Sequence, residues 1–259
     1  MKNSLKNIQE RQQRILEYIN QTGHAEVETL SKHFQVSSVT VRRDLDNLAK
    51  NGQIIRNFGG ARKLLEEMPP YSSASSSTSQ EATRRALAQA AASMIENDDI
   101  VLINSSLTAS YVLEYLDNKQ VTIVTNNIST LIRKRGPNTT LIITGGQATD
   151  GHASLTGPYT TNALSNIVAS KCILGVRGIH AEEGITSQVL EESYINQLMI
   201  RQTNGNVIIV ADSSKIGKKN SFFSGDIHSI SNLITTSDAK PNDIEELQNA
   251  GVQIKTVSI

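Results

Sequence analysis

From residue 100 onward, short runs rich in Val, Ile and Leu alternate with helix-like stretches in this 259-residue chain. The strand-like runs are 100–103, 121–124, 141–144, 172–174, 207–211, 233–235 and 252–257. The helix-like stretches between them are 108–116, 128–135, 160–169, 188–201 and 243–250. Buried strands that alternate with helices predict an open, mostly parallel sheet with helices on both faces. We therefore expect an α/β domain over 81–259.

The first part of the chain has helical periodicity instead. Apolar residues spaced three and four apart predict one helix that ends at Gly23 and a short second helix over 27–34. Ser37 is a good N-cap for a third helix, which the Asn51-Gly52 pair ends. A helix, a short helix and a capped third helix, in this order, are typical of a helix-turn-helix.

A strand-like stretch and two adjacent glycines follow the third helix. Residues 53–57 alternate as a strand does, and Gly59 and Gly60 predict a turn, so this segment is expected to form a wing. We therefore predict an α+β winged helix-turn-helix domain over 1–63. Residues 64–80 are rich in Ser and Pro and poor in apolar residues, which predicts a linker to the α/β open-sheet domain.

The zero net charge of the chain hides an asymmetry. Residues 1–63 hold eleven Lys and Arg against six acidic residues, a balance of +5, and the remainder has a balance of −5. A basic module beside an acidic remainder is the electrostatic pattern of a nucleic-acid-binding domain joined to a domain with another role.

The third predicted helix has an apolar side and a polar side. Val41, Leu45 and Leu48 recur at helical spacing and are expected to be buried, and Asp44 and Asp46 are expected to pair within the protein. Arginine can bind a guanine edge or a phosphate with two donors, and short hydroxyl side chains allow close approach. The residues predicted to contact DNA are Ser37, Ser38, Thr40, Arg42, Arg43, Arg56 and Arg62. The alternative is an amphipathic helix with a solvated charged face.

At this helix and wing the sequence resembles the DeoR family of bacterial repressors. The family signature is Thr-(Ile/Val)-Arg-(Arg/Lys)-Asp-Leu, then a leucine, and a wing that ends in Gly-Gly. The matching residues are Thr40, Val41, Arg42, Arg43, Asp44, Leu45 and Leu48, then Arg56, Asn57, Phe58, Gly59 and Gly60. The resemblance continues through nearly the whole chain. It implies a repressor of a sugar-utilisation operon, which binds double-stranded operator DNA and has a sensor domain similar to ribose-5-phosphate isomerase. Because one recognition helix reads only a few base pairs, we also expect a homo-oligomer on paired half-sites.

A polar turn follows the first predicted strand of the sensor domain. Where the family has Asp-x-Gly-Thr-Thr, this chain has Asn104, Ser105, Ser106, Leu107 and Thr108. A strand, a tight polar turn and a helix start offer free backbone N–H groups, a positive helix end and hydroxyls, all of which favour a phosphate. The alternative is a plain Ser/Thr N-cap.

Other polar loops follow later predicted strands, where open α/β sheets bind their ligands. Lys215 lies in Ala-Asp-Ser-Ser-Lys-Ile-Gly, which matches the family's Ala-Asp-Ser-Ser-Lys-Phe-Gly almost letter for letter. It is either a phosphate-binding cation or an ordinary surface lysine. The residues predicted to bind a small phosphorylated metabolite as effector are Ser105, Ser106, Thr108, Asn126, Gly146 and Lys215.

The sensor domain also departs from the family pattern. Asn104 replaces an acid, Ser106 a glycine, Leu107 a threonine, Thr149 a basic residue, Arg177 an acid and Asn196 a lysine, and the linker arginine expected near Ala74 or Ser75 is missing. These departures predict a pocket that is either tuned to an unusual effector or partly degenerate.

No catalytic motif accompanies these features. The five histidines show no metal-ligand spacing with one another or with Cys172, and Walker A, Rossmann and nucleophile-elbow motifs are absent. Two classes of function remain: a ligand-gated repressor, and a sugar-phosphate isomerase or lactonase with a basic N-terminal domain. An isomerase needs a carboxylate base, and the loop position that could supply one is Asn104, which favours the repressor. We predict no enzyme activity, no metal and no cofactor.

The sequence also predicts where the protein works. It has no run of eighteen apolar residues and no apolar signal-peptide stretch near its N-terminus. A single cysteine fits a reducing compartment. We expect a cytoplasmic, nucleoid-associated protein.

Overall fold

The computed structural model describes residues 2–22, 24–51, 53–57, 59–63, 78–148 and 153–258. The chain divides into two units, Met1–Glu67 and Met68–Ile259, and each is described by itself. Residues 64–77, which make up most of the predicted linker, and Thr149 lie outside the described residues.

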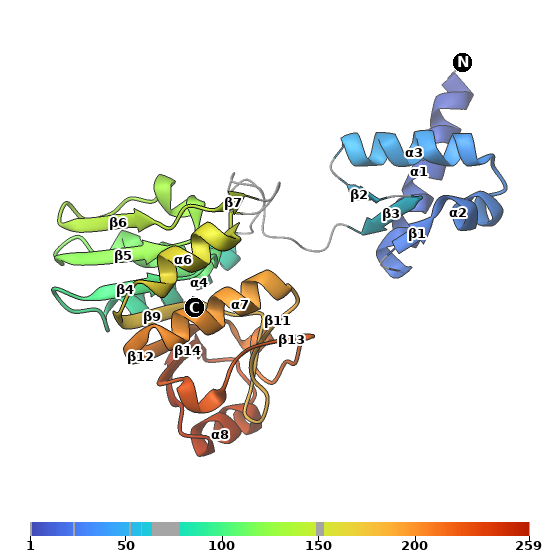
Figure 1. The fold of residues 1–259 in the computed structure, drawn as a ribbon. Helices are drawn as coiled ribbons and strands as arrows, with labels where there is room; N and C mark the ends of the chain where they lie inside the picture. The colour runs from blue at the N-terminus through green and yellow to red at the C-terminus, as the bar shows by residue number, and fades with distance from the viewer. Residues whose placement is uncertain are drawn as a thin grey trace. The chain divides into compact units, whose positions relative to one another are not determined.

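The described part of the N-terminal unit contains three helices and a small sheet (Figure 1). Its elements are α1 (Lys2–Thr22), β1 (His24–Glu26), α2 (Val27–Phe34), α3 (Ser38–Lys50), β2 (Ile54–Asn57) and β3 (Gly60–Lys63). The sheet has the order β1-β3-β2, and both strand pairs are antiparallel. The three helices and the wing therefore follow one another as the sequence predicts.

Local interactions determine where α2 ends and α3 begins. Gln35 ends α2 in the left-handed conformation, with φ 53°. Ser37 has an extended backbone, and its hydroxyl accepts a hydrogen bond from the backbone N–H of Thr40 at 3.2 Å, as expected of an N-cap. The apolar stripe predicted on α3 is buried in the core of the unit with residues of α1, α2 and the strands.

The wing contains a contact that the sequence pattern does not predict. β1 is a three-residue strand that pairs with β3. A Cβ atom on Gly60 would lie 2.3 Å from the carbonyl oxygen of Ala25, so only glycine allows β1 and β3 to approach this closely. Gly59 makes the turn, with φ 90°. The two glycines therefore have different roles, one in the turn and one in strand packing.

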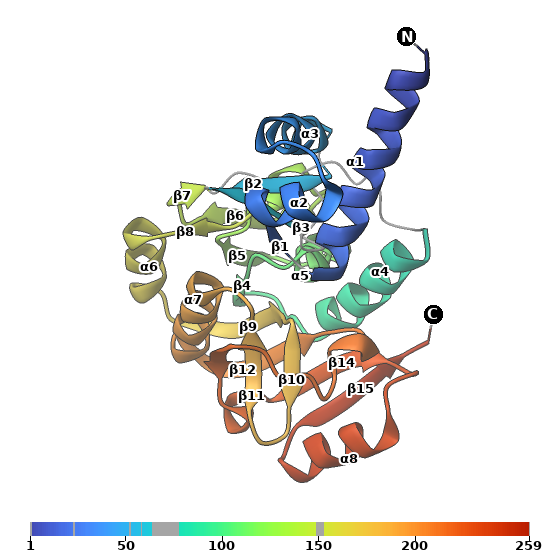
Figure 2. The same ribbon diagram turned by 90° about the vertical axis from the view of Figure 1, so that its right-hand side faces the viewer.

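A seven-stranded parallel sheet forms the centre of the C-terminal unit (Figures 1 and 2). Its strands are β4 (Ile100–Ile103), β5 (Val121–Thr125), β6 (Thr139–Ile143), β9 (Ala169–Gly175), β12 (Thr203–Val210), β14 (Asn232–Thr236) and β15 (Gln253–Val257). They lie in the order β15-β14-β12-β9-β4-β5-β6, and every neighbouring pair is parallel. Each of the seven predicted strand-like runs overlaps one strand of this sheet.

Helices cover both faces of the sheet, as predicted. They are α4 (Thr78–Ala92), α5 (Leu107–Ser110), α6 (Pro158–Ser165), α7 (Leu190–Arg201) and α8 (Pro241–Asn249). α4 and α5 pack with Ile103, Ile173 and the strand residues on their face, whereas α6, α7 and α8 pack with Leu102, Leu174 and the residues that alternate with them. Because successive residues of a strand point to opposite faces, two separate cores lie on the two sides of the sheet.

Two predicted helices differ in the structure. The stretch 108–116 overlaps the four-residue α5 and contains the 3-10 helix η1 (Tyr111–Tyr115), and the stretch 128–135 contains the 3-10 helix η2 (Ile128–Ile132). In each, a Ser or Thr hydroxyl donates a hydrogen bond to the carbonyl oxygen three residues earlier, at 2.7 and 2.6 Å. Such local hydrogen bonds compete with a regular α-helix.

Short strands outside the central sheet are not predicted from the sequence. They are β7 (Gln147–Ala148), β8 (Leu155–Thr156), β10 (Gly178–His180), β11 (Gly184–Ser187) and β13 (Phe222–Gly225). β7 and β8 form a hairpin, and β10, β11 and β13 form a second antiparallel sheet. With two to four residues each, they are too short to show a strand periodicity.

The direction in which the central sheet grows reverses between β4 and β9. Strands β4, β5 and β6 extend the sheet one way, and β9, β12, β14 and β15 extend it the other way. In open parallel sheets, ligands bind in the crevice outside the carboxyl ends of the strands at such a switch point. The loops that follow β4 and β9 therefore form the candidate ligand site, named here the switch-point crevice.

Candidate functional site

The N-terminal part of α3 presents two arginines to solvent. Arg42 and Arg43 are exposed, and within the described residues neither guanidinium makes a hydrogen bond or an ion pair. Val39, beside them, is 70% exposed. The hydroxyls of Ser37 and Thr40 are hydrogen-bonded to each other at 2.9 Å. This surface offers free cationic groups, hydroxyls and an apolar side chain at the start of one helix.

The acidic residues of α3 pair within the unit, as predicted. Asp44 is 2% exposed; Arg11 Nε donates to its Oδ2 at 2.6 Å, and Gln12 Nε2 donates to its Oδ1 at 3.0 Å. The hydrogen bond to Asp44 raises the pKa of Arg11. Asp46 Oδ1 lies 3.0 Å from Nε of Arg56. Neither carboxylate therefore neutralises the two exposed arginines near the start of α3.

The two wing arginines predicted to contact DNA lie in different strands. Arg56 of β2 contacts Asp46, and its Nη1 also donates to the carbonyl oxygen of Gly60 at 2.7 Å. These contacts link β2 to α3 and β3. Arg62 lies in β3, where its backbone pairs with His24, and its side chain is outside the described part of the chain.

At the switch-point crevice, Asn104 joins the loop after β4 to the end of β9. Its Oδ1 accepts hydrogen bonds from the N–H groups of Gly175 at 3.1 Å and Ser106 at 3.2 Å. Its Nδ2 donates to the carbonyl oxygen of Gly175 at 2.9 Å and to Oδ1 of Asn196, on α7, at 3.0 Å. An amide side chain has two donor hydrogens and two acceptor lone pairs, so all hydrogen-bonding positions of Asn104 are used. Asn104 therefore shapes the crevice and keeps no group free for a ligand.

Two of the departures from the family pattern thus contact each other. Asn104 stands where the family has an acid and Asn196 where it has a lysine, and their amides are hydrogen-bonded although 92 positions separate them in the sequence. In this chain the two amides form a bridge that carries no charge.

The turn after β4 uses several of its groups internally. Ser106 is the N-cap of α5, and its hydroxyl oxygen accepts from the N–H of Ala109 at 3.3 Å. Its carbonyl oxygen accepts from Nδ2 of Asn127 at 3.1 Å. A Cβ atom on Gly175 would lie 1.9 Å from the Ser106 hydroxyl oxygen, so glycine is required where these loops meet. Because α5 has four residues, the positive helix end expected at this turn is weak.

The other predicted effector residues lie at the same edge of the sheet. Within the described residues, the hydroxyls of Ser105 and Thr108 and the ammonium of Lys215 have no hydrogen-bond partner. Asn126 is 1% exposed; its Nδ2 donates twice, whereas its buried Oδ1 has no partner among the described residues. The β5 loop therefore contains a buried acceptor, Oδ1 of Asn126, without a hydrogen-bond partner among the described residues. Gly146, with φ 130°, follows β6.

These residues are spread along the edge and do not meet at one point. Gly146 follows β6 and Lys215 follows β12, and three strands separate β6 from β12. With about 4.8 Å between neighbouring strands, the two carrying strands are about 19 Å apart. The loops of β4, β5 and β9 lie between them, so the switch-point crevice is the central part of the predicted site.

Asn127 and Gly175 hold this crevice together, although the sequence analysis does not select them. Asn127 connects the β5 loop to the β4 loop through Ser106, and its Oδ1 accepts from the N–H and hydroxyl of Ser129 at 3.0 and 2.6 Å. The available sequence signal is position, because both residues lie at or just after the end of a buried strand.

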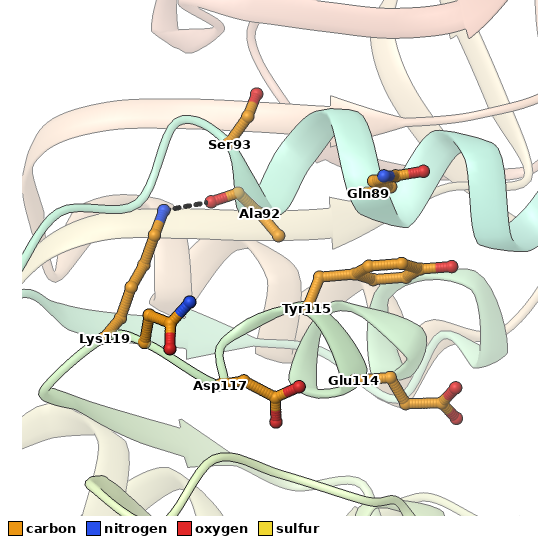
Figure 3. A pocket seen from close by; sticks show the side chains of 8 residues that line it. Gln89, Ala92, Ser93, Glu114, Tyr115, Asp117 and Lys119 are labelled. Atoms are coloured by element: carbon orange, nitrogen blue, oxygen red, sulfur yellow. Dashed lines mark hydrogen bonds between the residues drawn. The ribbon is translucent and has the colours of Figure 1, made fainter.

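A cavity of about 400 Å³ lies elsewhere in this unit, between the end of α4 and η1 (Figure 3). Its lining residues are Gln89, Ala92, Ser93, Glu114, Tyr115, Asp117, Asn118 and Lys119. The ammonium of Lys119 donates to the carbonyl oxygens of Ala92, at 2.7 Å, and Ile95. Lys119 precedes β5, so this cavity lies toward the amino ends of the strands. With its lysine engaged and two acidic side chains beside it, the cavity is poorly suited to an anionic ligand.

Both units match models of known protein families. The model of the DeoR-like helix-turn-helix domain matches residues 11–66, and the model of the DeoR C terminal sensor domain matches residues 79–237. The chain belongs to the DeoR family of transcriptional regulators. This DeoR-family regulator therefore combines the two domains that the sequence resemblance implies.

Named relatives match this regulator over almost its whole length. The HTH-type transcriptional repressor GlcR of Bacillus subtilis is 31% identical over 95% of this chain and 95% of its own length. The lactose phosphotransferase system repressor of Staphylococcus epidermidis is 25% identical over 97% of this chain and 100% of its own. Among solved structures, ribose 5-phosphate isomerase from Plasmodium falciparum is 17% identical over 52% of each chain with a TM-score of 0.37, a likeness too distant to carry an argument.

The family decides between the two classes of function that the sequence leaves open: the protein is a transcriptional regulator and not an enzyme. Cys172 is fully buried, as expected of a small apolar residue, and burial raises the pKa of its thiol. Across the described residues, no group of three or more His, Cys, Asp and Glu side chains could hold a metal ion. In the same residues, no helix combines the length and apolarity needed to span a bilayer.

Proposed function

We propose that this protein is a sequence-specific repressor of a sugar-utilisation operon, released from its operator by a phosphorylated sugar or a related metabolite bound in the C-terminal unit. The observation that carries the proposal is a pair of arginines near the start of α3 that have no partner among the described residues, in a helix-turn-helix of a regulator family. The relatives named as a repressor and as a lactose phosphotransferase system repressor support the sugar-related role.

In this proposal α3 enters the major groove of operator DNA. Arg42 and Arg43 bind guanine edges or phosphates, and Val39 can contact a thymine methyl group. The remaining contacts are assigned to Ser37, Ser38 and Thr40 at the helix start and to Arg56 and Arg62 on the wing. Because one recognition helix reads only a few base pairs, we further propose a homo-oligomer on paired half-sites.

The effector is assigned to the carboxyl edge of the central sheet. The hydroxyls of Ser105 and Thr108, which have no partner among the described residues, can donate to phosphate or sugar oxygens, and Oδ1 of Asn126 can accept from a sugar hydroxyl. Ser106 and Gly146 shape the neighbouring loops, and Lys215 supplies a cation farther along the edge. Because a repressor acts on DNA, we assign the protein to the nucleoid in the cytoplasm.

The test starts from operator fragments selected from genomic DNA with the purified full-length chain. Fluorescence anisotropy then measures affinity for the selected duplex, a scrambled duplex and the selected duplex with a panel of pentose and hexose phosphates. The proposal expects at least a thousandfold preference for the operator, in the range of specific DNA-binding proteins. It also expects at least one sugar phosphate to weaken binding when its unphosphorylated parent does not. Equal affinity for both duplexes would contradict the repressor role, and release by unphosphorylated sugars alone would contradict the effector class.

A further inference from the structure

Arg177 lies two residues after the end of β9, in a loop of the switch-point crevice. Its side chain is 31% exposed, and its Nε lies 3.7 Å from Oε2 of Glu192 on α7. Within the described residues, the two terminal nitrogens of this guanidinium have no hydrogen-bond partner. The carboxylate therefore engages the Nε side of the group and leaves the terminal nitrogens, which can bind an oxyanion with two parallel hydrogen bonds, available.

Glu192 is itself held in place. Its Oε2 accepts a hydrogen bond from the hydroxyl of Ser187 at 3.2 Å, and its side chain is 15% exposed. Glu192 and Asn196 are four residues apart on α7, so they lie on the same helix face about 6 Å apart along the axis. Asn196 bonds to Asn104 of the β4 loop. The ion pair and the neutral amide bridge are thus neighbours on α7, which lies beside β9 in Figure 2.

The Arg177–Glu192 ion pair and the Asn104–Asn196 amide bridge differ in charge, and this difference indicates which group binds an anion. Asn104 has no free hydrogen-bonding position, and the bridge that it forms with Asn196 is uncharged. Arg177, in the loop after β9, brings a full positive charge to the same crevice, and its terminal nitrogens have no partner among the described residues. The loop after β9 therefore carries a cation that can meet an anion, whereas the neighbouring amide bridge carries no charge.

We propose that Arg177 is the anion anchor of this regulator and binds the phosphate group of the effector through its terminal nitrogens, while the carboxylate of Glu192 competes with the phosphate for its charge. This inference rests on the proposed function and refines it, because it assigns the phosphate to the crevice between β4 and β9. The sugar portion then extends toward the β5 loop, where Oδ1 of Asn126 accepts from a hydroxyl.

Binding of inorganic phosphate to the full-length chain tests this assignment without any operator DNA. Titrations followed by phosphorus NMR line broadening or calorimetry compare the wild type with Arg177→Gln and with Arg201→Gln, an exposed arginine on the last turn of α7. We expect Arg177→Gln to weaken phosphate binding at least tenfold and Arg201→Gln to leave it unchanged. Acetate titrated in parallel distinguishes a phosphate anchor from a general carboxylate site, and we expect it to bind more weakly than phosphate.

Glu192→Gln separates an anion anchor from a purely structural ion pair. Removing the competing carboxylate should tighten phosphate binding if Arg177 meets the anion. Unchanged phosphate affinity in Arg177→Gln, or weaker binding in Glu192→Gln, would overturn the inference. Preferential binding of acetate would overturn the phosphate assignment. These readouts do not involve DNA, so the proposed function stands or fails separately, on operator release by sugar phosphates.

Discussion

On α3, Arg42 and Arg43 are exposed and have no partners among the described residues. In the switch-point crevice, by contrast, every side-chain donor and acceptor of Asn104 is hydrogen-bonded to another group of the protein. The DNA-binding helix has its interaction groups on the surface of one regular element. The crevice is made by loops and a helix that are distant in the sequence, and its polar groups mostly hold those segments together. Recognition by the first region depends on individual side chains, while recognition by the second depends on how segments are joined.

The largest effect is expected from the Arg42→Ala, Arg43→Ala double variant. Each bidentate contact of an arginine to a base contributes about 1–3 kcal/mol, so the double variant should bind operator roughly 30-fold more weakly or worse. Because neither side chain has a partner in the described residues, thermal stability should stay within about 0.5 kcal/mol of the wild type. Anisotropy and thermal unfolding measure the two quantities. If the double variant lost thermal stability as well as operator affinity, the two arginines would have a structural role. The contrast between α3 and the switch-point crevice would then be wrong.

The contrast between the regions also explains what the sequence can predict. Helix caps and apolar stripes involve residues within one or two turns, so Ser37 and the buried side of α3 follow from local pattern. The strands of the central sheet follow from apolar runs in the same way. The bridge between Asn104 and Asn196 depends on how β4 and α7 pack, and no local pattern encodes it. The strands β7, β8, β10, β11 and β13 are missed because their pairing, and not their composition, makes them strands.

The acidic residues of α3 sharpen the distinction between paired and free groups. Asp44 is buried against Arg11, whereas the Asp46 side chain, paired with Arg56, is 56% exposed. Removing one partner of a buried pair costs about 3 kcal/mol or more, while exposed pairs contribute about 1 kcal/mol or less. Hydrogen exchange of α3 amides should therefore show a large loss of protection in Asp44→Ala and a small one in Asp46→Ala. Similar losses in both variants would contradict the assigned role of burial.

A double-mutant cycle tests whether the amide bridge is one unit. Asn104→Asp places a carboxylate oxygen against the Gly175 carbonyl and the Asn196 Oδ1, which should cost about 1–3 kcal/mol. Adding Asn196→Lys supplies a cation to that carboxylate, so the double variant should recover at least about half of the loss. Urea unfolding of the C-terminal unit measures the coupling. Additive effects of the two substitutions would show that the amide bridge is not one unit.

The last comparison concerns the pH dependence of stability at a charged pair on the opposite edge of the sheet, Asp99 and Lys171. Burial alone would raise the pKa of Asp99, but hydrogen bonds from the Glu96 N–H, Lys171 and Ser170 lower it overall. A carboxyl group with a lowered folded-state pKa stabilises the protein above its unfolded pKa, and this contribution is lost as pH falls through the folded value. We expect Asp99→Asn to flatten the stability profile below about pH 4. Asn104→Ala is the control, because it removes no titratable group and should leave the dependence of stability on pH unchanged. An equally flat profile in this control would show that the acid sensitivity does not come from Asp99.

The central claim is that ligand binding in the crevice and DNA binding by α3 are coupled within one regulator. The direct measurement is a pair of titrations on the full-length chain: operator affinity with and without a saturating sugar phosphate, and sugar-phosphate affinity with and without operator. Binding linkage requires the same factor in both, and a tenfold factor corresponds to about 1.4 kcal/mol of coupling. The account predicts a factor of ten or more, equal in the two directions. A sugar phosphate that binds the chain tightly and leaves operator affinity unchanged would contradict it.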